Sequence, residues 1–215
     1  MLEFFAGIVI GVVGAAPFLM HRLRRVAQND AEVAVSCALR RHLTDAPYHL
    51  LNNVTLRHGQ STTQIDHLLV SQYGIFVIET KRYKGWIYGN EADRKWTQVL
   101  YRAKFRFGNP IKQNAGHVEA VRALFTLDAT IFHSVVVFCG QPQFKTELPA
   151  NVIHYRQLVP YISAFTEEVI TYTQLVYAVG RIETQRLSRS REVDEQHRNN
   201  VAERLERRTR QFKRF

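Results

Sequence analysis

The sequence predicts an α/β fold built on a mixed β-sheet that is flanked by helices. The central evidence is a pair of runs rich in Val, Ile and Phe, residues 65–70 and 75–78, on either side of the polar break Ser71-Gln72-Tyr73-Gly74. Two such runs around a glycine-containing break are typical of an antiparallel hairpin. Both runs are apolar at nearly every position. Because both faces of these strands must then be covered, we expect helices on two sides of the sheet.

The register of this hairpin places two carboxylates opposite each other. If residues 71–74 form the loop, paired residues have numbers that sum to 145, and Asp66 lies opposite Glu79. Opposed side chains have Cβ atoms about 4.5–5.5 Å apart, and like charges at that distance destabilise a sheet unless a cation or a proton lies between them. Alternation along the strand places Lys81 on the face of Glu79. Two acids and an amine are therefore expected to converge.

This arrangement suits a divalent metal ion. Mg²⁺ or Mn²⁺ prefers carboxylate, carbonyl and water oxygens, so Asp66 and Glu79 are the candidate ligands. Thr80 points to the other face, and only its backbone carbonyl is available as a further metal ligand. The alternative interpretation is a simple ion pair between Glu79 and Lys81 at the end of a strand.

The same residues carry a family resemblance. Asp66, with Glu79-Thr80-Lys81 after an apolar strand, resembles the D...(D/E)-x-K core of the restriction-endonuclease-like, or PD-(D/E)XK, nucleases. A longer set of segments resembles the nuclease-related domain, NERD, over roughly residues 29–126: Gln64-Ile65-Asp66-His67, Gly74 to Lys81, Gly85, Trp96, and Asn109-Pro110-Ile111 with Gln113. The resemblance implies a restriction-endonuclease-like fold and a metal-dependent nuclease site in which Asp66, Glu79 and Lys81 are catalytic.

Two predicted helices bring further candidates to this site. A helix over about residues 29–43 has Glu32 in its first turn, where a carboxylate suits the helix dipole. The resemblance implies a second role for Glu32, holding the metal or water. A helix over about residues 109–124 begins with an Asn-Pro cap and carries Gln113 and His117 one turn apart. For Gln113 the resemblance implies a role in orienting water or a backbone phosphate.

Basic residues follow the hairpin in two groups. Arg82 and Lys84 alternate with aromatic residues. This pattern is typical of segments that bind phosphates and stack on nucleobases, and also of twisted strand ends. Residues 100–107 alternate bases with apolar residues, so the bases share one face if this segment is a strand. That face is either a nucleic-acid surface or a solvated edge protected by charge. The bases of the second group are Arg102, Lys104 and Arg106.

The remaining elements are placed by their apolar patterns. Strands are expected at residues 48–58, around 96–99, at 131–138 and, as a short addition, at 151–155. Helices are expected at residues 156–165 and 168–185. The domain as a whole should span residues 27–180, followed by a basic helical tail, residues 181–215, that is either solvated or docked on a partner or a lipid surface.

The chain begins with a candidate membrane anchor, residues 1–25. Residues 2–20 carry one charge, and these 19 residues span about 28 Å as a helix, close to the thickness of a bilayer core. Arginines follow the run rather than precede it, which favours a retained anchor over a cleaved signal peptide or a buried helix. The body should then face the cytoplasm, at a bacterial-type inner membrane. Gly7 and Gly11 form a G-x-x-x-G pair, a weak signal that is compatible with a homodimer through this span.

The composition favours a polyanionic partner. The 215 residues include 29 Lys and Arg against 19 Asp and Glu, for a net charge of +10 and a pI near 9.9. Charge alone does not separate nucleic acid from an acidic membrane surface. Cys37 and Cys139 lie far apart in the sequence without metal-ligand spacing, which excludes a zinc ribbon and a disulfide framework and fits a reducing compartment.

These patterns predict a membrane-anchored cytoplasmic nuclease that uses Mg²⁺ or Mn²⁺ to hydrolyse phosphodiester bonds of nucleic acid, with DNA expected over RNA. In this hypothesis Lys81 positions or deprotonates water. One alternative is a tethered nucleic-acid-binding or scaffolding module without turnover, and another is a lipid-surface adaptor. The two opposed carboxylates favour the nuclease, because a binding module has no evident need for them.

Overall fold

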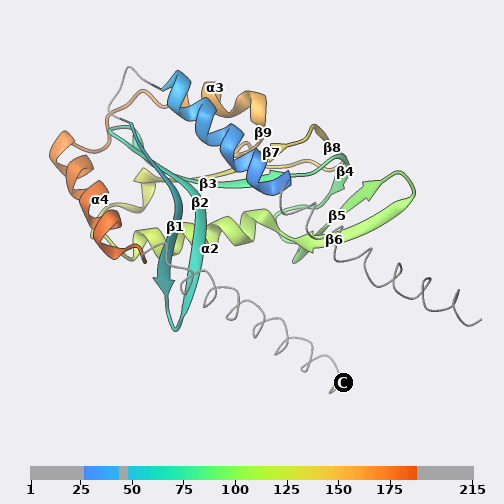
Figure 1. Cartoon of the computed structure of the whole chain (residues 1–215), viewed down its shortest axis with the longest axis horizontal. Helices are drawn as coiled ribbons and strands as arrows, with labels where there is room; N and C mark the ends of the chain where they lie inside the picture. Colours follow the sequence, from blue (N-terminus) through green and yellow to red (C-terminus); the bar gives the residue numbers. More distant parts are fainter. Residues whose placement is uncertain (1–26, 44–47, 188–215) are drawn as a thin grey trace, which may run out of the picture.

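The computed structural model describes residues 27–43 and 48–187 and has a mixed α/β fold with two mixed sheets flanked by helices (Figure 1). The expected anchor, residues 1–25, and the tail beyond residue 187 lie outside the described residues. Among the described residues, no helix has the length and apolar character needed to cross a membrane.

The first sheet has five strands in the order β1-β2-β3-β7-β9. β1, β2 and β3 are antiparallel neighbours, whereas β3, β7 and β9 run parallel to one another. The strands are β1 (His49–His58), β2 (Ser61–Ser71), β3 (Gly74–Arg82), β7 (Phe132–Cys139) and β9 (Val152–His154). All of these strands were expected from the sequence, and their ends differ from the expected ones by a few residues at most.

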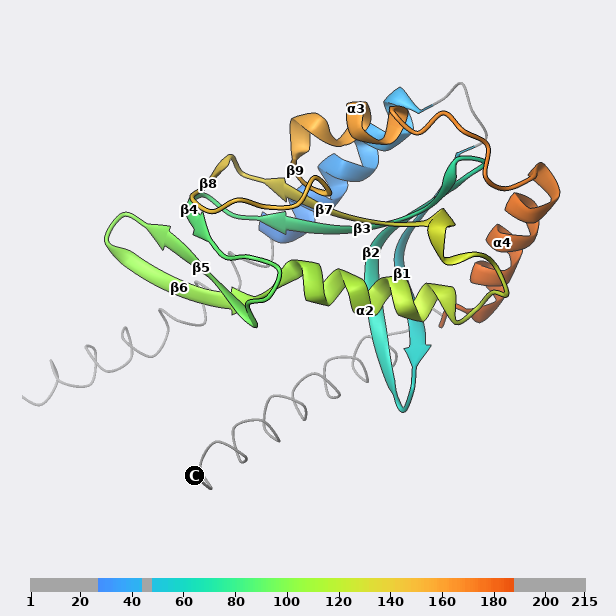
Figure 2. The same cartoon turned by 180° about the vertical axis from the view of Figure 1, so that it is seen from behind.

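Helices cover both faces of this sheet, as the apolar runs of the hairpin predict (Figures 1 and 2). On one face, α2 (Pro110–Arg122) and α4 (Tyr172–Gln185) pack on a core that includes Leu68 and Val77. On the other face, the helix over residues 27–42 and α3 (Leu158–Ser163) pack on a core that includes Phe76 and Ile78. Neighbouring residues of β3 therefore point into different cores, which explains its continuous apolar sequence.

The structure contains a second sheet where the sequence predicts one sheet only. Its strand order is β6-β5-β4-β8. The strands are β4 (Gly85–Tyr88), β5 (Lys95–Leu100), β6 (Ala103–Gly108) and β8 (Pro142–Phe144). Gly85 separates β4 from β3 because it has φ of +78°, a conformation that favours glycine, and a Cβ there would lie 2.4 Å from the carbonyl oxygen of Val99.

The register of the hairpin is confirmed, but its loop is shorter than expected. Ser71 pairs with Gly74 and His67 with Ile78, so the partner numbers sum to 145 as predicted. Only residues 72–73 form the turn. The hydroxyl of Ser71 donates to the Gly74 carbonyl at 3.2 Å and accepts from the Tyr73 amide at 3.2 Å, which closes the turn inside the ladder.

Three other expected elements are shorter than the sequence suggests. Residues 100–107 are not one strand, because a turn at residues 101–102 separates β5 from β6. Tyr101 in this turn has φ of +55°. The helix expected at 156–165 is a 3₁₀ turn, Tyr155–Gln157, followed by α3. The helix expected at 168–185 begins only at Tyr172, because Thr171 caps it through the Gln174 amide. A further 3₁₀ turn, Ala129–Ile131, precedes β7.

Candidate active site

The candidate site lies where β2 and β3 separate from each other. Their ladder ends at the pair His67 and Ile78, after which β2 stays paired with β1 as far as Ser61, and β3 stays paired with β7 as far as Arg82 (Figure 2). Asp66 and Glu79, the predicted opposed pair, are the first residues beyond the last rung. Backbone groups in such a fork lose their ladder partners and become available to side chains and ligands.

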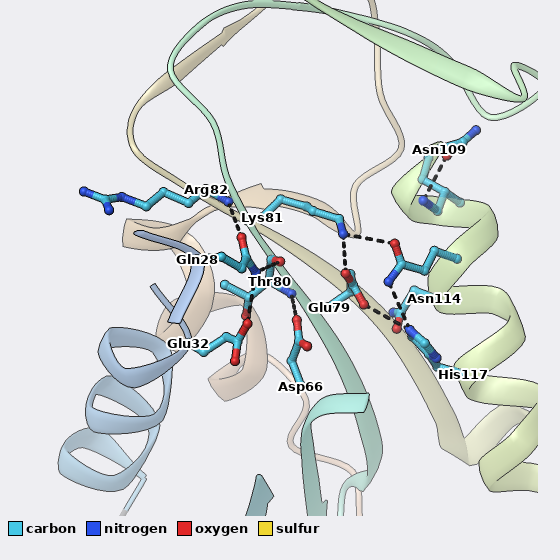
Figure 3. A network of polar contacts seen from close by, with 12 residues as sticks. Gln28, Glu32, Asp66, Glu79, Thr80, Lys81, Arg82, Asn109, Asn114 and His117 are labelled. Carbon is cyan, nitrogen blue, oxygen red and sulfur yellow. Dashed lines mark hydrogen bonds and ion pairs between the residues drawn. The ribbon is translucent and has the colours of Figure 1, made fainter. Parts of the chain in front are cut away.

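Asp66 binds the backbone of the opposite strand at this fork. Its Oδ2 accepts a hydrogen bond of 2.8 Å from the Thr80 amide, in the place of a ladder bond (Figure 3). On its other side Asp66 faces Asn53 of β1, between the pairs Asn52 with His67 and Val54 with Ile65. Asn53 has φ of +51°, a conformation that Asn tolerates better than most residues. The backbone is thus distorted beside Asp66, as is common near functional groups.

Glu79 lies on β3, and both of its carboxylate oxygens are engaged. Its side chain is 2% exposed, Oε1 lies 2.5 Å from Nζ of Lys81, and Oε2 lies 3.1 Å from Nε2 of His117 (Figure 3). The Lys81 ammonium also donates to Oε1 of Gln113 at 3.0 Å. Glu79 and Lys81 share the face of the sheet that α2 covers, as the alternation predicts, because both contact side chains of α2. Asp66 lies where the alternation of β2 breaks, since Ile65 and Leu68 both belong to the core on the α2 side.

His117 of α2 is a site residue to which the sequence analysis assigned no role. It is buried and bridges two strands, because Nδ1 lies 2.8 Å from Oγ1 of Thr63 and Nε2 lies near Glu79. Gln113, one helical turn earlier, is within 3.4 Å of the same ring. The available signal was the four-residue spacing of Gln113 and His117, which places both side chains on one side of α2.

Gln28 is a second residue that the sequence analysis missed. It lies in the helix over residues 27–42, where its amide nitrogen donates to the Thr80 carbonyl at 2.6 Å and to Oε1 of Glu32 at 3.2 Å. Its amide oxygen accepts from the backbone of Arg82 at 3.1 Å. Gln28 therefore connects Glu32 to the backbone of β3 (Figure 3). No motif in the sequence distinguishes this glutamine from a solvent-exposed one at the start of a helix.

The electrostatic environment of the site shifts the pKa values of its three carboxyl groups in different directions. Burial, together with the charges of Glu79 and Glu32, raises the pKa of Asp66 well above its usual range, although the Thr80 amide opposes this. Burial also raises the pKa of Glu32. Burial opposes ionisation of Glu79 too, but Lys81 and His117 outweigh it and lower the pKa of Glu79. Glu79 is thus the stable anion of the site, whereas at Asp66 the Thr80 amide and the charge of Lys81 do not outweigh burial.

The donor atoms of the site fit a hard divalent cation. Asp66 and Glu79 supply carboxylate oxygens, which suit Mg²⁺ or Mn²⁺ with water in the remaining positions. The Thr80 carbonyl accepts from Gln28 at 2.6 Å and would have to give up this bond to serve as a further ligand. Across residues 27–43 and 48–187, no group of three or more His, Cys, Asp or Glu side chains is arranged to hold a metal ion. A metal therefore has to share Glu79 with Lys81 or displace it, and needs water or substrate oxygens.

The predicted nucleic-acid-binding residues are not gathered around the two carboxylates. Arg82 points away from Lys81 (Figure 3) and lies 3.7 Å from Asp30. Lys84 is exposed in the short segment that connects β3 to β4. The three bases of the second group do not share one strand face, because Arg102 lies in the turn before β6. Lys104 and Arg106 do share the exposed face of β6.

Comparison with known proteins places this site within one family. The sequence model of the nuclease-related domain, NERD, matches residues 27–139, which is more than half of the chain and includes every residue of the site. An uncharacterized protein of Bacillus anthracis is 36% identical over 130 residues, or 58% of this chain and 60% of that protein, so the chain spans about three fifths of this relative's length. No solved structure matches the chain. The chain belongs to the nuclease-related domain family.

Proposed function

We propose that this protein is a metal-dependent nuclease that hydrolyses phosphodiester bonds of nucleic acid, with DNA as the expected substrate. The observation that carries the proposal is the meeting of Asp66 and Glu79 at the fork between β2 and β3, with Lys81 bound to Glu79 at 2.5 Å. The charge of Glu79 contributes to the raised pKa of Asp66, and strongly perturbed carboxyl groups of this kind are characteristic of functional sites.

Asp66, Glu79 and the Thr80 carbonyl would hold Mg²⁺ or Mn²⁺ in this proposal. When bound, such an ion supplies Lewis acidity at the phosphate and lowers the pKa of a coordinated water. The role of Asp66 follows from its raised pKa: it binds a proton in the absence of metal and releases it when a cation takes the proton's place. Glu32, whose pKa is also raised, would hold a water molecule beside Asp66.

Lys81 would act as a cation rather than as a base. Burial opposes its charge, but the adjacent Glu79 carboxylate outweighs burial and raises the pKa of Lys81 above the ordinary value. A lysine held in the charged form stabilises the negative charge that develops on a phosphate in the transition state. Gln113 accepts a hydrogen bond from the same ammonium and would keep it aimed at the site when Glu79 turns to the metal.

A second candidate function is a binding or scaffolding module without turnover. It is favoured by one observation, that Lys81 and His117 occupy both oxygens of Glu79, so this carboxylate has partners without a metal. If this ion pair never opens, Glu79 is a structural residue, and the nucleic acid would only bind.

We further propose that the protein is a single-pass protein of a bacterial-type inner membrane with its nuclease domain in the cytoplasm. The support is the charge-poor run over residues 2–20 and the arginines that follow it, Arg22, Arg24 and Arg25. Such an anchor would restrict the nuclease to nucleic acid at the inner surface of the membrane.

The nuclease is tested with the full chain purified in detergent, using plasmid DNA, single-stranded DNA and RNA in Mg²⁺, in Mn²⁺ and in EDTA. Cleavage is expected only with a divalent ion and should be lost in Asp66→Asn. Glu119→Gln, which removes an exposed carboxylate of α2, is the control and should cleave normally. Equal cleavage by wild type and Asp66→Asn would exclude the site, and binding without cleavage by both would support the scaffold.

A further inference from the structure

The second sheet turns one face toward solvent. Along β4 and β5 the residues alternate, and those that point inward, Ile87, Trp96 and Gln98, are buried. Their neighbours in sequence point outward and are at least partly exposed. Cross-strand pairing extends this alternation over all four strands, so the outward side chains form one continuous surface.

This surface combines aromatic rings with bases. Trp86 is 46% exposed and Tyr88 is 38% exposed, although rings of this size are usually covered more fully. None of the four strands contains Asp or Glu. We name this surface the basic aromatic face and define it by Trp86, Tyr88, Lys95, Lys104, Arg106 and Lys145.

The register places the bases beside the rings in two rows. Lys104 pairs with Val99, and Val99 pairs with Trp86, so one row of residues across the strands has a basic side chain on β6 at one end and an aromatic ring on β4 at the other. The next row runs in the same way from Arg106 through Thr97 to Tyr88. Neighbouring strands lie about 4.8 Å apart, so each basic residue lies about 10 Å from the aromatic residue in the same row, measured along the sheet. A polymer with a charged backbone and planar side groups matches this spacing.

A base also lies on the other side of Trp86. Nζ of Lys145, directly after β8, is 4.9 Å from the centre of the Trp86 ring, within the range of a cation–π contact. The two rings on β4 are therefore flanked by positive charge at both edges of the sheet. Because no acid in these strands neutralises it, the face carries a net positive charge that is complementary to phosphate.

We propose that the basic aromatic face binds single-stranded nucleic acid, with nucleobases stacked on Trp86 and Tyr88 and phosphates bound by the surrounding Lys and Arg side chains. This inference rests on the proposed nuclease function and names its substrate class. The rings select a single strand because the faces of bases in a duplex are covered by their neighbours and only the edges are accessible in the grooves. Stacking is possible for every base, so the face would have little sequence preference.

The face is rigidly connected to the candidate active site. β3 leads into β4 through residues 83–84, and Trp86 follows Lys81 by five residues, or roughly 16 Å of extended chain. The β4–β5 loop is bound to the start of α2, because the Asn109 amide donates to the carbonyls of Asn90 and Asp93 at 3.0 and 2.7 Å. α2 also carries Gln113 and His117. A strand held on the face is thus kept within a few nucleotides of Glu79.

Binding is tested in EDTA, so that cleavage cannot interfere, with the full chain in detergent and a labelled oligonucleotide as single strand or as blunt duplex. Trp86→Ala and Tyr88→Ala should each weaken single-strand affinity about tenfold and leave duplex affinity nearly unchanged. Replacing Lys104 and Arg106 with Gln should reduce the slope of log affinity against log salt concentration by about 1.4. Tyr172→Ala and Arg156→Gln, at exposed positions outside the basic aromatic face, are the matched controls.

Tryptophan fluorescence gives a direct readout of stacking. The chain has two tryptophans, and Trp96 is fully buried, so a single strand that stacks on Trp86 should quench the emission of wild type and not that of Trp86→Ala. Unchanged single-strand affinity in both aromatic variants would overturn the inference. An emission change caused by nanodiscs that contain phosphatidylserine, with no change caused by oligonucleotide, would also overturn it and identify a lipid contact. Because no metal is present, a failure to cleave in Mg²⁺ affects only the nuclease proposal.

Discussion

Lys81 and Glu79 form a buried ion pair, with Nζ and Oε1 2.5 Å apart, at the position where the donor set is suited to a metal. The two residues are neighbours on one face of β3, so the strand itself holds the ammonium against the carboxylate. This pair provides a positive charge beside the acids when no metal is bound. Metal binding is therefore expected to compete with Lys81 for Glu79, and the two events can be separated by mutation.

Replacing Lys81 with Ala should separate metal binding from chemistry. The variant loses the competitor for Glu79, so Mg²⁺ affinity measured by calorimetry should stay the same or increase. Cleavage should fall on the order of 100-fold or more, because the charge that stabilises the reacting phosphate is gone. Lys84→Ala, at an exposed position three residues later, controls the calorimetry. A large loss of Mg²⁺ affinity in Lys81→Ala would show that the lysine organises the metal ligands instead.

Asp66→Asn should stabilise the protein without metal in a pH-dependent way. The pKa of Asp66 is higher in the folded state than in the unfolded chain, so the folded state binds more protons between the two values, and stability falls as pH rises through that window. The penalty is complete above the folded pKa and absent below about pH 4, the unfolded value. Removing it should raise the free energy of unfolding at pH 7.

The measurement for Asp66→Asn is thermal unfolding from pH 4 to pH 8 in EDTA. The difference between variant and wild type should grow with pH and then level off, and added Mg²⁺ should stabilise wild type only. Asn keeps an oxygen that can accept from the Thr80 amide, so the fork itself should persist. Glu119→Gln should show no such pH-dependent gain. If Asp66→Asn is less stable than wild type at neutral pH, the carboxylate of Asp66 does not carry the expected penalty.

Sequence patterns predicted the first sheet well because its apolar strands leave little choice of register. The sum of 145 followed from the position of the polar break at residues 71–74, because a four-residue loop and the observed two-residue turn have the same centre. The second sheet was missed because its separation depends on one glycine, Gly85, whose positive φ depends on packing against Val99. The prediction that residues 100–107 form one strand was wrong because the alternation of basic and apolar residues continues through the turn at Tyr101 and does not reveal it.

The candidate site was predicted in part. Carboxylates at fixed register positions, Asp66 and Glu79, follow from strand geometry. Contacts that depend on how a helix sits on the sheet do not, and these include the bonds of His117 to Glu79 and of Gln28 to the Thr80 carbonyl. Their spacing in sequence, 38 and 52 residues, leaves no local pattern to detect.

Asn109 should be important for both stability and the position of α2. Its side-chain oxygen accepts from the Ile111 amide at 2.9 Å as a helix cap, while its nitrogen binds the carbonyls of the β4–β5 loop. Asn109→Ala removes both sets of bonds and should cost about 2–3 kcal/mol of unfolding free energy. Asn109→Ser keeps a capping oxygen but not the amide donors and should lose less. Asp128→Ala, which removes an exposed cap, is expected to cost less than Asn109→Ala.

The proposed membrane anchor predicts that the full chain stays with membranes after a carbonate wash. The charge-poor run over residues 2–20 is long enough for one span, and the arginines that follow favour the cytoplasmic side. A chain that starts at residue 26 should be released from the membrane by the same wash. A reporter that is active only in the periplasm should stay inactive when fused at Phe215, and activity there would reverse the orientation.

His117 should position Glu79 through its bond to Thr63. The ring lies between the Thr63 hydroxyl at 2.8 Å and the Glu79 carboxylate at 3.1 Å, so it fixes the direction of Glu79 from the far strand of the fork. Such partners behind a metal ligand typically change metal affinity by 10- to 100-fold. We therefore expect His117→Phe to weaken Mg²⁺ binding within that range, and Thr63→Val to weaken it less.

A double-mutant cycle separates this role from general destabilisation. If His117 acts through Thr63, the double variant should bind Mg²⁺ no more weakly than His117→Phe alone, because the Thr63 bond is already lost. Independent effects would instead multiply. His49→Asn, at an exposed position on β1, controls for the loss of a histidine and should leave Mg²⁺ affinity unchanged. Unfolding free energies measured in EDTA show whether folding is affected, and a variant that unfolds more easily yet binds Mg²⁺ normally would assign His117 to the core alone.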